Sequence, residues 1–367
     1  MAQHMRTKPE NPYLALPASR YWKSAVAERH VTELEELYQP KFVLRPNDRI
    51  TVAGSCFAQH VGRNLKMQGF TVLDKEPAPE PLSEDIAQKF GFGIYSGRYG
   101  NIYTARQLVQ LIKDSSAGAV REEDFWLRDS AVFDALRPNV EPEGLGSVKE
   151  AILHRTEHLM KVLELFQETD VMIFTLGLTE AWENKMTGTV YPTCPGVLAG
   201  EFDERVFGFV NYDFNAVLAD IVEVRSLLKA INPNMNFLLT VSPVPLTATA
   251  SGQHVLVATT YSKSVLRAVC GSACAMFDDV DYFPSYELIA SPVARGFFYE
   301  PNLRSINRNG VALVMSQFLK AHAADKIVPP APEPVKETET AGERRRTRKR
   351  HRNDVVCEEE LLEAFAR

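Results

Sequence analysis

The chain has 367 residues, 45% of them hydrophobic and 24% charged, which is enough to bury one large core without disulfides or metals. Its net charge is −6, and residues 325–367 contribute nothing to it because they hold 10 basic and 10 acidic residues. An acidic core argues against specific nucleic-acid binding by the main domain. The start of the chain lacks an apolar signal core and no run of 18 apolar residues occurs, so the pattern predicts neither export by this route nor a membrane span.

The five cysteines are scattered and odd in number, which does not suggest a disulfide framework. Cys270 and Cys274 have no second pair and no nearby histidines at zinc spacing. We therefore expect reduced thiols in a cytoplasmic protein, with no metal and no cofactor.

Residues 1–46 come before the first strong strand pattern. Asn11–Ala25 carries too many aromatic and aliphatic residues for a disordered arm, and Val31–Tyr38 has the apolar spacing of a short amphipathic helix. We expect this N-terminal segment to pack on the core.

The stretch Ile50–Leu65 reads as a strand, a tight turn at Gly54 and a helix. Ser55 and Cys56 fall on the turn, where the first N–H groups and the positive dipole end of the helix favour an anion. Because thiolate is the reactive form of cysteine, Cys56 is a candidate nucleophile. The turn alone is equally compatible with a helix cap that carries a buried, inert thiol.

The region that follows this helix contains a strand pattern at Gly69–Leu73 and a loop rich in glycine and tyrosine at Gly91–Tyr103. The loop precedes a helix near Ala105–Ile112, and its glycines lack the spacings that bind phosphate or dinucleotides. Residues 125–146 look like an insertion with turns. A helix is predicted at Val148–Phe166, and its two histidines, His154 and His158, are expected to be solvated.

The run Val171–Gly177 is apolar throughout, which is typical of a strand buried on both faces of a parallel sheet. Thr179 and Glu180 come at its carboxyl end, where ligands bind in doubly wound sheets. The rest of the chain continues the alternation of strands and helices. The predicted helices are 214–230, 255–270 and 308–323, and the predicted strands are 236–241 and approximately 276–280. The fold expected for residues 47–324 is a three-layer, doubly wound α/β domain with a mostly parallel sheet.

The motif Gly-Ser-Cys-Phe-Ala at residues 54–58 resembles the signature of the GSCFA family, and that family is similar to the SGNH/GDSL hydrolases. The resemblance extends from about Asn47 to Phe318, with further blocks at 175–182, 240–245, 261–268 and 282–287. It implies an SGNH-hydrolase-like fold, with Cys56 at the nucleophile position and Ser55 in place of the usual aspartate.

The same resemblance implies an oxyanion hole. Gly100 and Asn101 stand where the second SGNH block supplies a glycine N–H. In the later block Thr179 replaces the usual asparagine, and its hydroxyl is a donor.

The resemblance also shows what is missing. SGNH enzymes carry a histidine base in their last block, but Arg304 stands at that position here and arginine is not a base at neutral pH. Two consequences are open: the chain has lost hydrolysis and uses Arg304 to grip a carboxylate or phosphate, or another histidine serves as the base. His254, at the start of a helix beyond a core strand, is the best positioned substitute, and His60, four residues after Cys56, is a weaker candidate. Lys263 lies in the block at 261–268. A lysine near a thiol can lower the pKa of that thiol, but the default interpretation is a helix surface lysine.

The function that these residues predict is that of an SGNH-like hydrolase or acyl transferase, acting on an ester or thioester through Cys56 or Ser55. An acylated carbohydrate or surface polysaccharide is the expected substrate class, and Glu180 is expected to face it. The alternative is a non-catalytic module that binds an acylated sugar or an acyl carrier in the same cleft, with Arg304 clamping an anion. The catalytic set is therefore Cys56, Ser55 and His254.

Residues 325–367 are predicted to be a disordered tail. Its first part is rich in proline, and Arg344–Arg352 holds seven fixed positive charges in nine residues. Such a run fits an anionic polymer or a membrane surface. Asp354–Arg367 has the composition of a short acidic helix.

Overall fold

The computed structural model describes residues 11–34, 36–322 and 358–366. In this part of the chain, the main sheet has parallel strands in the order β1-β4-β8-β9. The strands are β1 (Ile50–Gly54), β4 (Val171–Leu176), β8 (Asn236–Val241) and β9 (Val280–Tyr282). This is the expected α/β architecture with a mostly parallel sheet.

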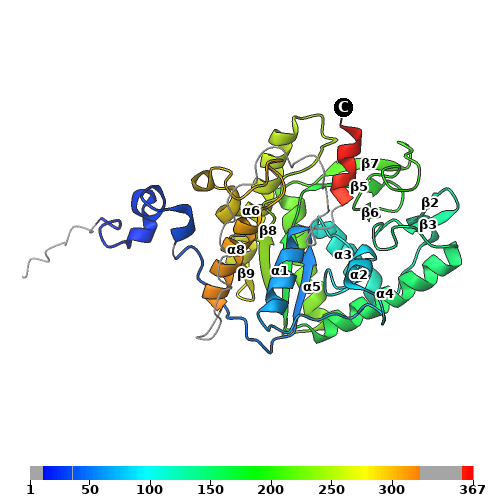
Figure 1. Cartoon of the computed structure of the whole chain (residues 1–367), viewed down its shortest axis with the longest axis horizontal. Coiled ribbons are helices and arrows are strands. Elements are labelled where there is room, and N and C mark those ends of the chain that lie inside the picture. Colours follow the sequence, from blue (N-terminus) through cyan, green and yellow to red (C-terminus); the bar gives the residue numbers. More distant parts are fainter. Residues whose placement is uncertain (1–10, 35, 323–357, 367) are drawn as a thin grey trace, which may run out of the picture.

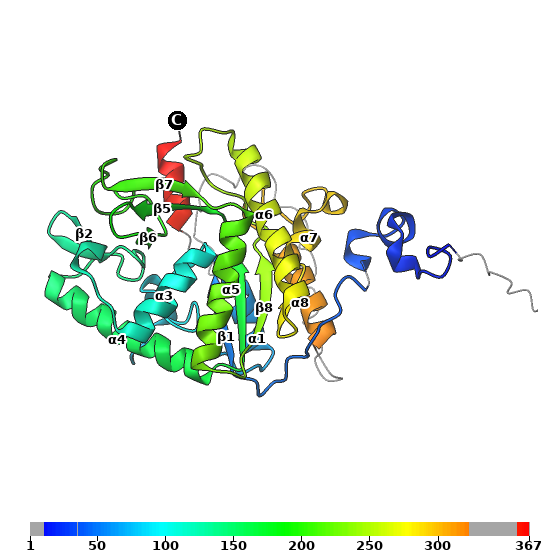
Figure 2. The same cartoon turned by 180° about the vertical axis from the view of Figure 1, so that it is seen from behind.

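Helices cover both faces of the sheet, which gives the predicted three layers. Figure 1 looks onto the face covered by α1 (Phe57–Met67) and α8 (Arg308–His322). Figure 2 looks onto the other face, covered by α5 (Phe214–Ile231) and α6 (Val255–Met276), with α3 (Ala105–Ala117) beside α5. The remaining α-helices of the described chain are α2 (Glu84–Lys89), α4 (Val148–Glu168) and α7 (Ser285–Ala290). No described helix has both the length and the apolar character needed to cross a membrane.

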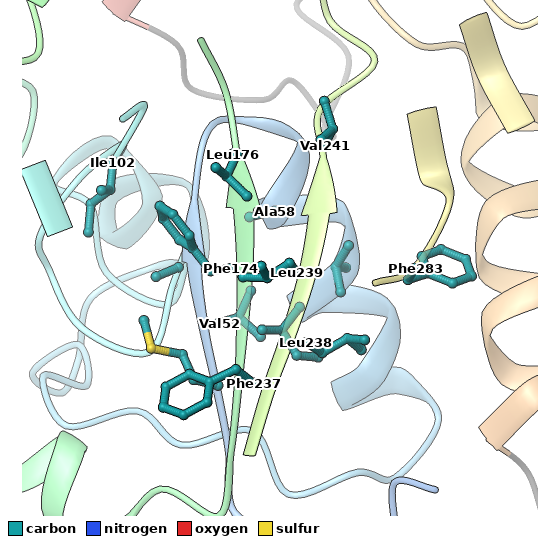
Figure 3. Close-up of a cluster of buried hydrophobic side chains, with 14 of the residues drawn as sticks. Val52, Ala58, Ile102, Phe174, Leu176, Phe237, Leu238, Leu239, Val241 and Phe283 are labelled. Carbon is teal, nitrogen blue, oxygen red and sulfur yellow. The ribbon is translucent and has the colours of Figure 1, made fainter. Parts of the chain in front are cut away.

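The core forms because the central strands are apolar on both faces. All six residues of β4 are buried, and five of the six residues of β8 are buried. Figure 3 shows Val52, Phe174 and Leu239 projecting from neighbouring strands towards the helical layers. A strand buried on both faces must be covered by two layers of helices, so the sequence of β4 and β8 largely determines the three-layer arrangement.

A second, antiparallel sheet was not predicted. It has the order β6-β5-β7, and its strand β5 starts four residues after β4 ends. The strands are β5 (Glu180–Asn184), β6 (Val190–Tyr191) and β7 (Phe207–Asn211). The insertion at 125–146 contains the hairpin β2 (Phe125–Arg128) and β3 (Ala131–Asp134). Both small sheets consist of short strands without a sustained apolar period, which is why the sequence pattern does not predict them.

The two ends of the N-terminal segment differ. Residues 36–46 lie against the core, where the Tyr38 hydroxyl donates to Asp281 at 2.9 Å and Leu44 is buried. Residues 11–30 project away from the body (Figure 1) and expose large side chains, including Tyr13 and Trp22. This arm holds η1 (Ala18–Arg20) and the π-helix η2 (Lys23–Ala27), and η3 (Val31–Glu33) follows it.

Three element boundaries differ from the prediction. The strand expected at Gly69–Leu73 is reduced to a single bridge between Val72 and Ile50, because the Thr71 N–H turns to the carbonyl of Pro46 instead. The helix expected at Val31–Tyr38 is one 3-10 turn. Helix α6 continues six residues past Cys270 despite Gly271, because Ala273 is buried on the core side.

The remaining short helices of the described chain are η4 (Glu122–Asp124), η5 (Pro292–Ala294) and η6 (Glu358–Phe365). Helix η6 falls inside the stretch predicted to form a short acidic helix. The proline-rich and basic parts of the predicted tail, Arg344–Arg352 included, lie outside the described residues.

Candidate active site

The site lies where the central strands end. The Ser55 N–H donates to the carbonyl of Thr175 at 3.0 Å, and the Ser242 N–H donates to the carbonyl of Leu176 at 2.9 Å. These bonds continue the ladders β1–β4 and β4–β8 by one residue. The first residues after each strand therefore meet at one edge, which is the edge used for ligands in sheets of this topology.

Two glycines permit this close approach. Gly54 has a φ of 137°, and a Cβ there would lie 2.4 Å from the carbonyl oxygen of Thr175. A Cβ on Gly177 would lie 2.8 Å from the Cβ of Ser55. Since real Cβ atoms do not approach other atoms so closely, only glycine at both positions allows the Ser55 turn to pack on the turn after β4.

A small pocket opens at this edge. Its lining comes from the ends of three strands, from the segment before α3 and from α6, and consists of Ser55, Cys56, Tyr103, Gly177, Leu178, Ser242, Val244, Leu246 and Lys263. Backbone hydrogen bonds connect the chain segments that form the pocket. The Gly177 N–H donates to the carbonyl of Tyr103 at 2.9 Å, and the Ile102 N–H donates to the carbonyl of Gly54 at 2.9 Å. The pocket is therefore built on rigid strand ends.

Cys56 stands at the start of α1, with helical backbone angles and a side chain that makes no cap hydrogen bond to the helix. It is 7% exposed and packs in an apolar cluster with Tyr103, Leu178 and Leu246. The thiol is thus both buried and directed to a pocket at a helix N-terminus. That position favours thiolate and therefore a nucleophile.

Ser55 precedes it and is 2% exposed. Its hydroxyl oxygen has no hydrogen-bond partner among the described residues, although it lines the pocket. Buried hydroxyls normally find partners, so this one is suited to bind a group that enters the pocket.

Lys263 does not lie at the helix surface, which was its default interpretation. It is 2% exposed, lines the pocket with Cys56, and donates from Nζ to the carbonyl of Gly177. The interpretation as a surface lysine is wrong. A signal was present, because Lys263 lies seven residues before the fully buried Cys270 and so shares its side of the helix.

The predicted oxyanion residues lie around the same edge. The amide oxygen of Asn101 accepts from the Tyr95 hydroxyl and, at 3.5 Å, from Nε2 of Gln59 on the first turn of α1. These contacts turn the Nδ2 donor of Asn101 away from Tyr95 and Gln59. Gly100 precedes it with a φ of 70°.

Thr179 is fully buried and is held on three sides. Its hydroxyl donates to Oδ1 of Asn211 at 2.6 Å, its N–H donates to the hydroxyl of Ser262 at 2.9 Å, and its carbonyl accepts from the Tyr212 N–H at 2.9 Å. Thr179 thereby ties β4, β7 and α6 together and is not among the residues that line the pocket.

Glu180 begins β5 and accepts a hydrogen bond from the Thr249 hydroxyl at 2.7 Å. Burial raises the pKa of this carboxyl, although the hydrogen bond from Thr249 opposes the shift. Glu180 thus links the antiparallel sheet to the loop that follows β8.

His254 is exposed and caps α6, where its Nδ1 accepts from the Leu256 N–H at 3.2 Å. Lys263 lies nine residues further along α6, or about 13 Å at 1.5 Å per residue. His254 is not among the residues that line the pocket.

Arg304 is buried in the loop between Tyr299 and Ile306, and its N–H donates to Oδ1 of Asn302 at 3.0 Å. The Tyr299 hydroxyl donates to the carbonyl of Pro243 at 2.9 Å, which holds this loop beside the loop after β8. Arg304 therefore lies near the edge of the sheet that carries the pocket, but outside the pocket lining.

A second buried polar region lies under the insertion, and we call it the ion cluster. It consists of Glu76, Arg98, Asp134, Arg137, Glu141, Arg155 and His158. Asp134 meets Arg137 at 2.7 Å and Arg155 at 3.1 Å, and Glu76 meets Nδ1 of His158 at 2.9 Å. His158 is 1% exposed, so the expectation that it is solvated is wrong.

Among the described residues, no three His, Cys, Asp or Glu side chains are grouped so that they could hold a metal ion. Taken together, the parallel sheet, the strand–turn–helix at Cys56 and the pocket at the strand ends define an α/β protein with a cysteine beside a pocket at the carboxyl edge of its sheet. The GSCFA family model matches residues 49–318, so the chain belongs to the GSCFA family. No curated protein sequence matches the chain.

Proposed function

We propose that the protein is a hydrolase or acyl transferase that cleaves an ester or thioester through Cys56. The observation that carries the proposal is the placement of the thiol at the N-terminus of α1, in a pocket at the carboxyl edge of the parallel sheet. An anionic nucleophile at a helix N-terminus, facing a partly apolar pocket, is the arrangement that acyl transfer needs.

In the proposed reaction, the sulfur of Cys56 attacks the carbonyl carbon and a C–S bond forms, while the carbonyl electron pair moves onto oxygen. N–H groups at the start of α1, with Gly100 and the Asn101 amide, are the proposed donors to that oxygen. Collapse of the intermediate breaks the bond to the alcohol or thiol, which leaves with a proton. Water, in a hydrolase, or an acceptor hydroxyl, in a transferase, then attacks the acyl-enzyme and releases Cys56.

An acylated carbohydrate is the substrate class that we propose. Narrow apolar walls formed by Leu178, Val244 and Leu246 suit a short acyl group better than a long one. The sugar part would lie outside, towards Glu180 and the loop after β8. The basic run Arg344–Arg352 is proposed to bind an anionic polymer or a membrane surface.

Turnover of a panel of chromogenic esters and acyl thioesters tests the proposal. Cys56→Ala should lower kcat/KM by about 1,000-fold or more because the covalent step is lost. Ser55→Ala should retain the acyl-enzyme, and mass spectrometry of trapped protein should find the acyl group on Cys56. If Cys56→Ala retains activity and Ser55→Ala does not, Ser55 is the nucleophile.

His254→Ala and Arg304→Ala separate the remaining roles. A base acts with the nucleophile as one unit, so a histidine base predicts that the double variant with Cys56→Ala is no worse than either single variant. A clamp predicts a higher KM with a smaller change in kcat for Arg304→Ala. If the wild type binds acylated sugars without turning any over, and Arg304→Ala abolishes that binding, the protein is a binding module.

A further inference from the structure

Lys263 lines the same pocket as the Cys56 thiol, whereas the predicted base His254 does not. We propose that Lys263 pairs with Cys56 as ammonium and thiolate, and that Lys263 carries the proton during turnover. This inference rests on the proposed function for the proton-transfer step, while the ion pair itself is a property of the resting protein.

The two residues come from opposite faces of the sheet and meet at its edge. Cys56 begins α1 on one face, Lys263 belongs to α6 on the other, and both line the same pocket. Lys263 Nζ is located by its hydrogen bond to the carbonyl of Gly177, and Gly177 is the residue on which Ser55 packs. Gly177 therefore contacts both Lys263, through its carbonyl, and Ser55, the residue before Cys56.

Hydrogen bonds fix the backbone of α6 around Lys263. Ser262, the residue before Lys263, accepts the hydrogen bond of the Thr179 N–H, and Leu246 N–H donates to Thr259 Oγ1 at 3.3 Å one turn earlier. Because α6 is attached to both the β4 turn and the loop after β8, the lysine cannot slide along the pocket. A catalytic group needs such support to hold its geometry.

Burial also argues for a role. Transferring an ammonium from water into a protein is costly unless groups of opposite charge or polar groups surround it, and a thiolate in the same pocket is such a group. Lys229 on the neighbouring α5, which is partly buried, shows the ordinary solution, an ion pair with Asp279 at 2.8 Å. Cys56, Lys263 and Tyr103 are the groups of the pocket lining that can titrate, and of these the thiol loses its proton most readily.

The proton balance closes without another reactant. At rest the Cys56 proton is on Lys263, leaving thiolate and ammonium. After the thiolate attacks the acyl carbon, the ammonium gives its proton to the departing alkoxide or thiolate. The neutral amine then takes a proton from water as that water attacks the acyl-enzyme, and thiolate and ammonium are restored when the carboxylic acid leaves as carboxylate with release of one proton to solvent.

The test compares two substitutions that separate charge from proton transfer. Lys263→Met keeps the length and apolar stem but removes the cation, whereas Lys263→Arg keeps a cation that cannot act as a base at neutral pH. The pH at which thiolate appears is measured from the ultraviolet absorbance of wild type minus Cys56→Ala. Lys320→Met, at an exposed position on α8, is the matched control.

For Lys263→Met we expect thiolate to appear about 1–3 pH units higher than in the wild type, because the neighbouring positive charge is gone. Lys263→Arg should keep the wild-type thiolate titration but lose turnover, and Lys320→Met should change neither. Thermal unfolding of each variant verifies that the protein is folded. An unchanged titration in folded Lys263→Met overturns the pair, even if the wild type turns substrate over and the proposed function stands.

If the wild type turns over no member of the substrate panel, the proposed function fails while the titration still decides the pair. If Lys263→Arg retains wild-type turnover, the cation matters but the proton-carrier role of Lys263 is overturned.

Discussion

The ion cluster and the pocket are both buried and polar, but they are built in opposite ways. In the ion cluster, acidic and basic groups from the insertion, α4 and the loop before α2 meet as pairs, so the charges compensate one another. In the pocket, the Ser55 hydroxyl lacks a partner among the described residues, and apolar side chains form much of the wall. Paired charges hold a structure in place, although Nε2 of His158 in the ion cluster has no hydrogen-bond partner among the described residues. A hydroxyl without a partner that lines a pocket can bind a ligand there.

Breaking the ion cluster should have the largest effect on stability. Asp134→Asn leaves Arg137 and Arg155 without their shared carboxylate, and such a loss in a buried site costs about 3–5 kcal/mol. Urea unfolding followed by circular dichroism measures it. Asp203→Asn, which breaks an exposed pair with Arg205, is the control and should leave the midpoint unchanged. Equal midpoints for the two variants would show that the ion cluster does not stabilise the fold.

The second-largest effect that we expect is a loss of stability in acid, caused by His158 in the ion cluster. Burial, together with the charge of Arg137, lowers the pKa of His158 to about 4, so the folded protein holds this imidazole neutral while the unfolded chain protonates it near 6.5. The contribution of neutral His158 to the free energy of unfolding is complete above pH 6.5. As the pH falls from 6.5 to 4, the free energy of unfolding decreases by about 2–3 kcal/mol. Urea midpoints across this range should vary less with pH in His158→Gln. If the urea midpoint of His158→Gln falls with pH as steeply as that of the wild type, other groups cause the loss of stability in acid. His60 and His322 are such groups, because burial lowers their pKa values to about 4 as well.

Gly177→Ala should damage the pocket more than the fold. Its Cβ would lie 2.8 Å from Ser55, so the nucleophile turn must shift. We expect kcat/KM to fall about 10- to 100-fold, because small displacements of a nucleophile are costly, with a stability loss of about 1–3 kcal/mol. Gly62→Ala in α1, where the nearest side chain is 3.7 Å away, is the control and should retain activity. Retained activity in Gly177→Ala would show that the turn tolerates movement.

The smallest effect expected is a difference in alkylation rate between thiols. Burial raises the pKa of Cys194 and of Cys274 to about 11, so both remain protonated at pH 7. Iodoacetamide should therefore label Cys56 first well below pH 8.5, by a few-fold only because Cys56 is itself buried. Peptide mapping after a short exposure measures the order. Slower labelling of Cys56 than of Cys194 would count against an activated thiol.

The sequence predicted the layered fold because the apolar runs of β4 and β8 are unambiguous, and it predicted the strand, turn and helix around Ser55 and Cys56 because Gly54 marks the end of β1. It did not predict the ion cluster, since His158 and Asp134 come together only through contacts between distant segments. The burial of Lys263 was not predicted for a related reason. A lysine on a helix is normally solvated, and its burial depends on the Gly177 carbonyl, which the sequence of α6 does not reveal.

The three bonds of Thr179 have a mechanical consequence. Asn211 on β7 accepts from its hydroxyl, Ser262 on α6 accepts from its N–H, and Tyr212, the residue after β7, donates to its carbonyl. The antiparallel sheet β6-β5-β7 therefore cannot tilt relative to the main sheet without breaking buried hydrogen bonds, each of which costs about 1–3 kcal/mol if left unsatisfied. The antiparallel sheet is therefore a rigid wall beside the pocket. Any widening of the entrance for a bulky substrate has to come from the loop between β8 and α6, which is attached to that wall through the hydrogen bond between Thr249 and Glu180.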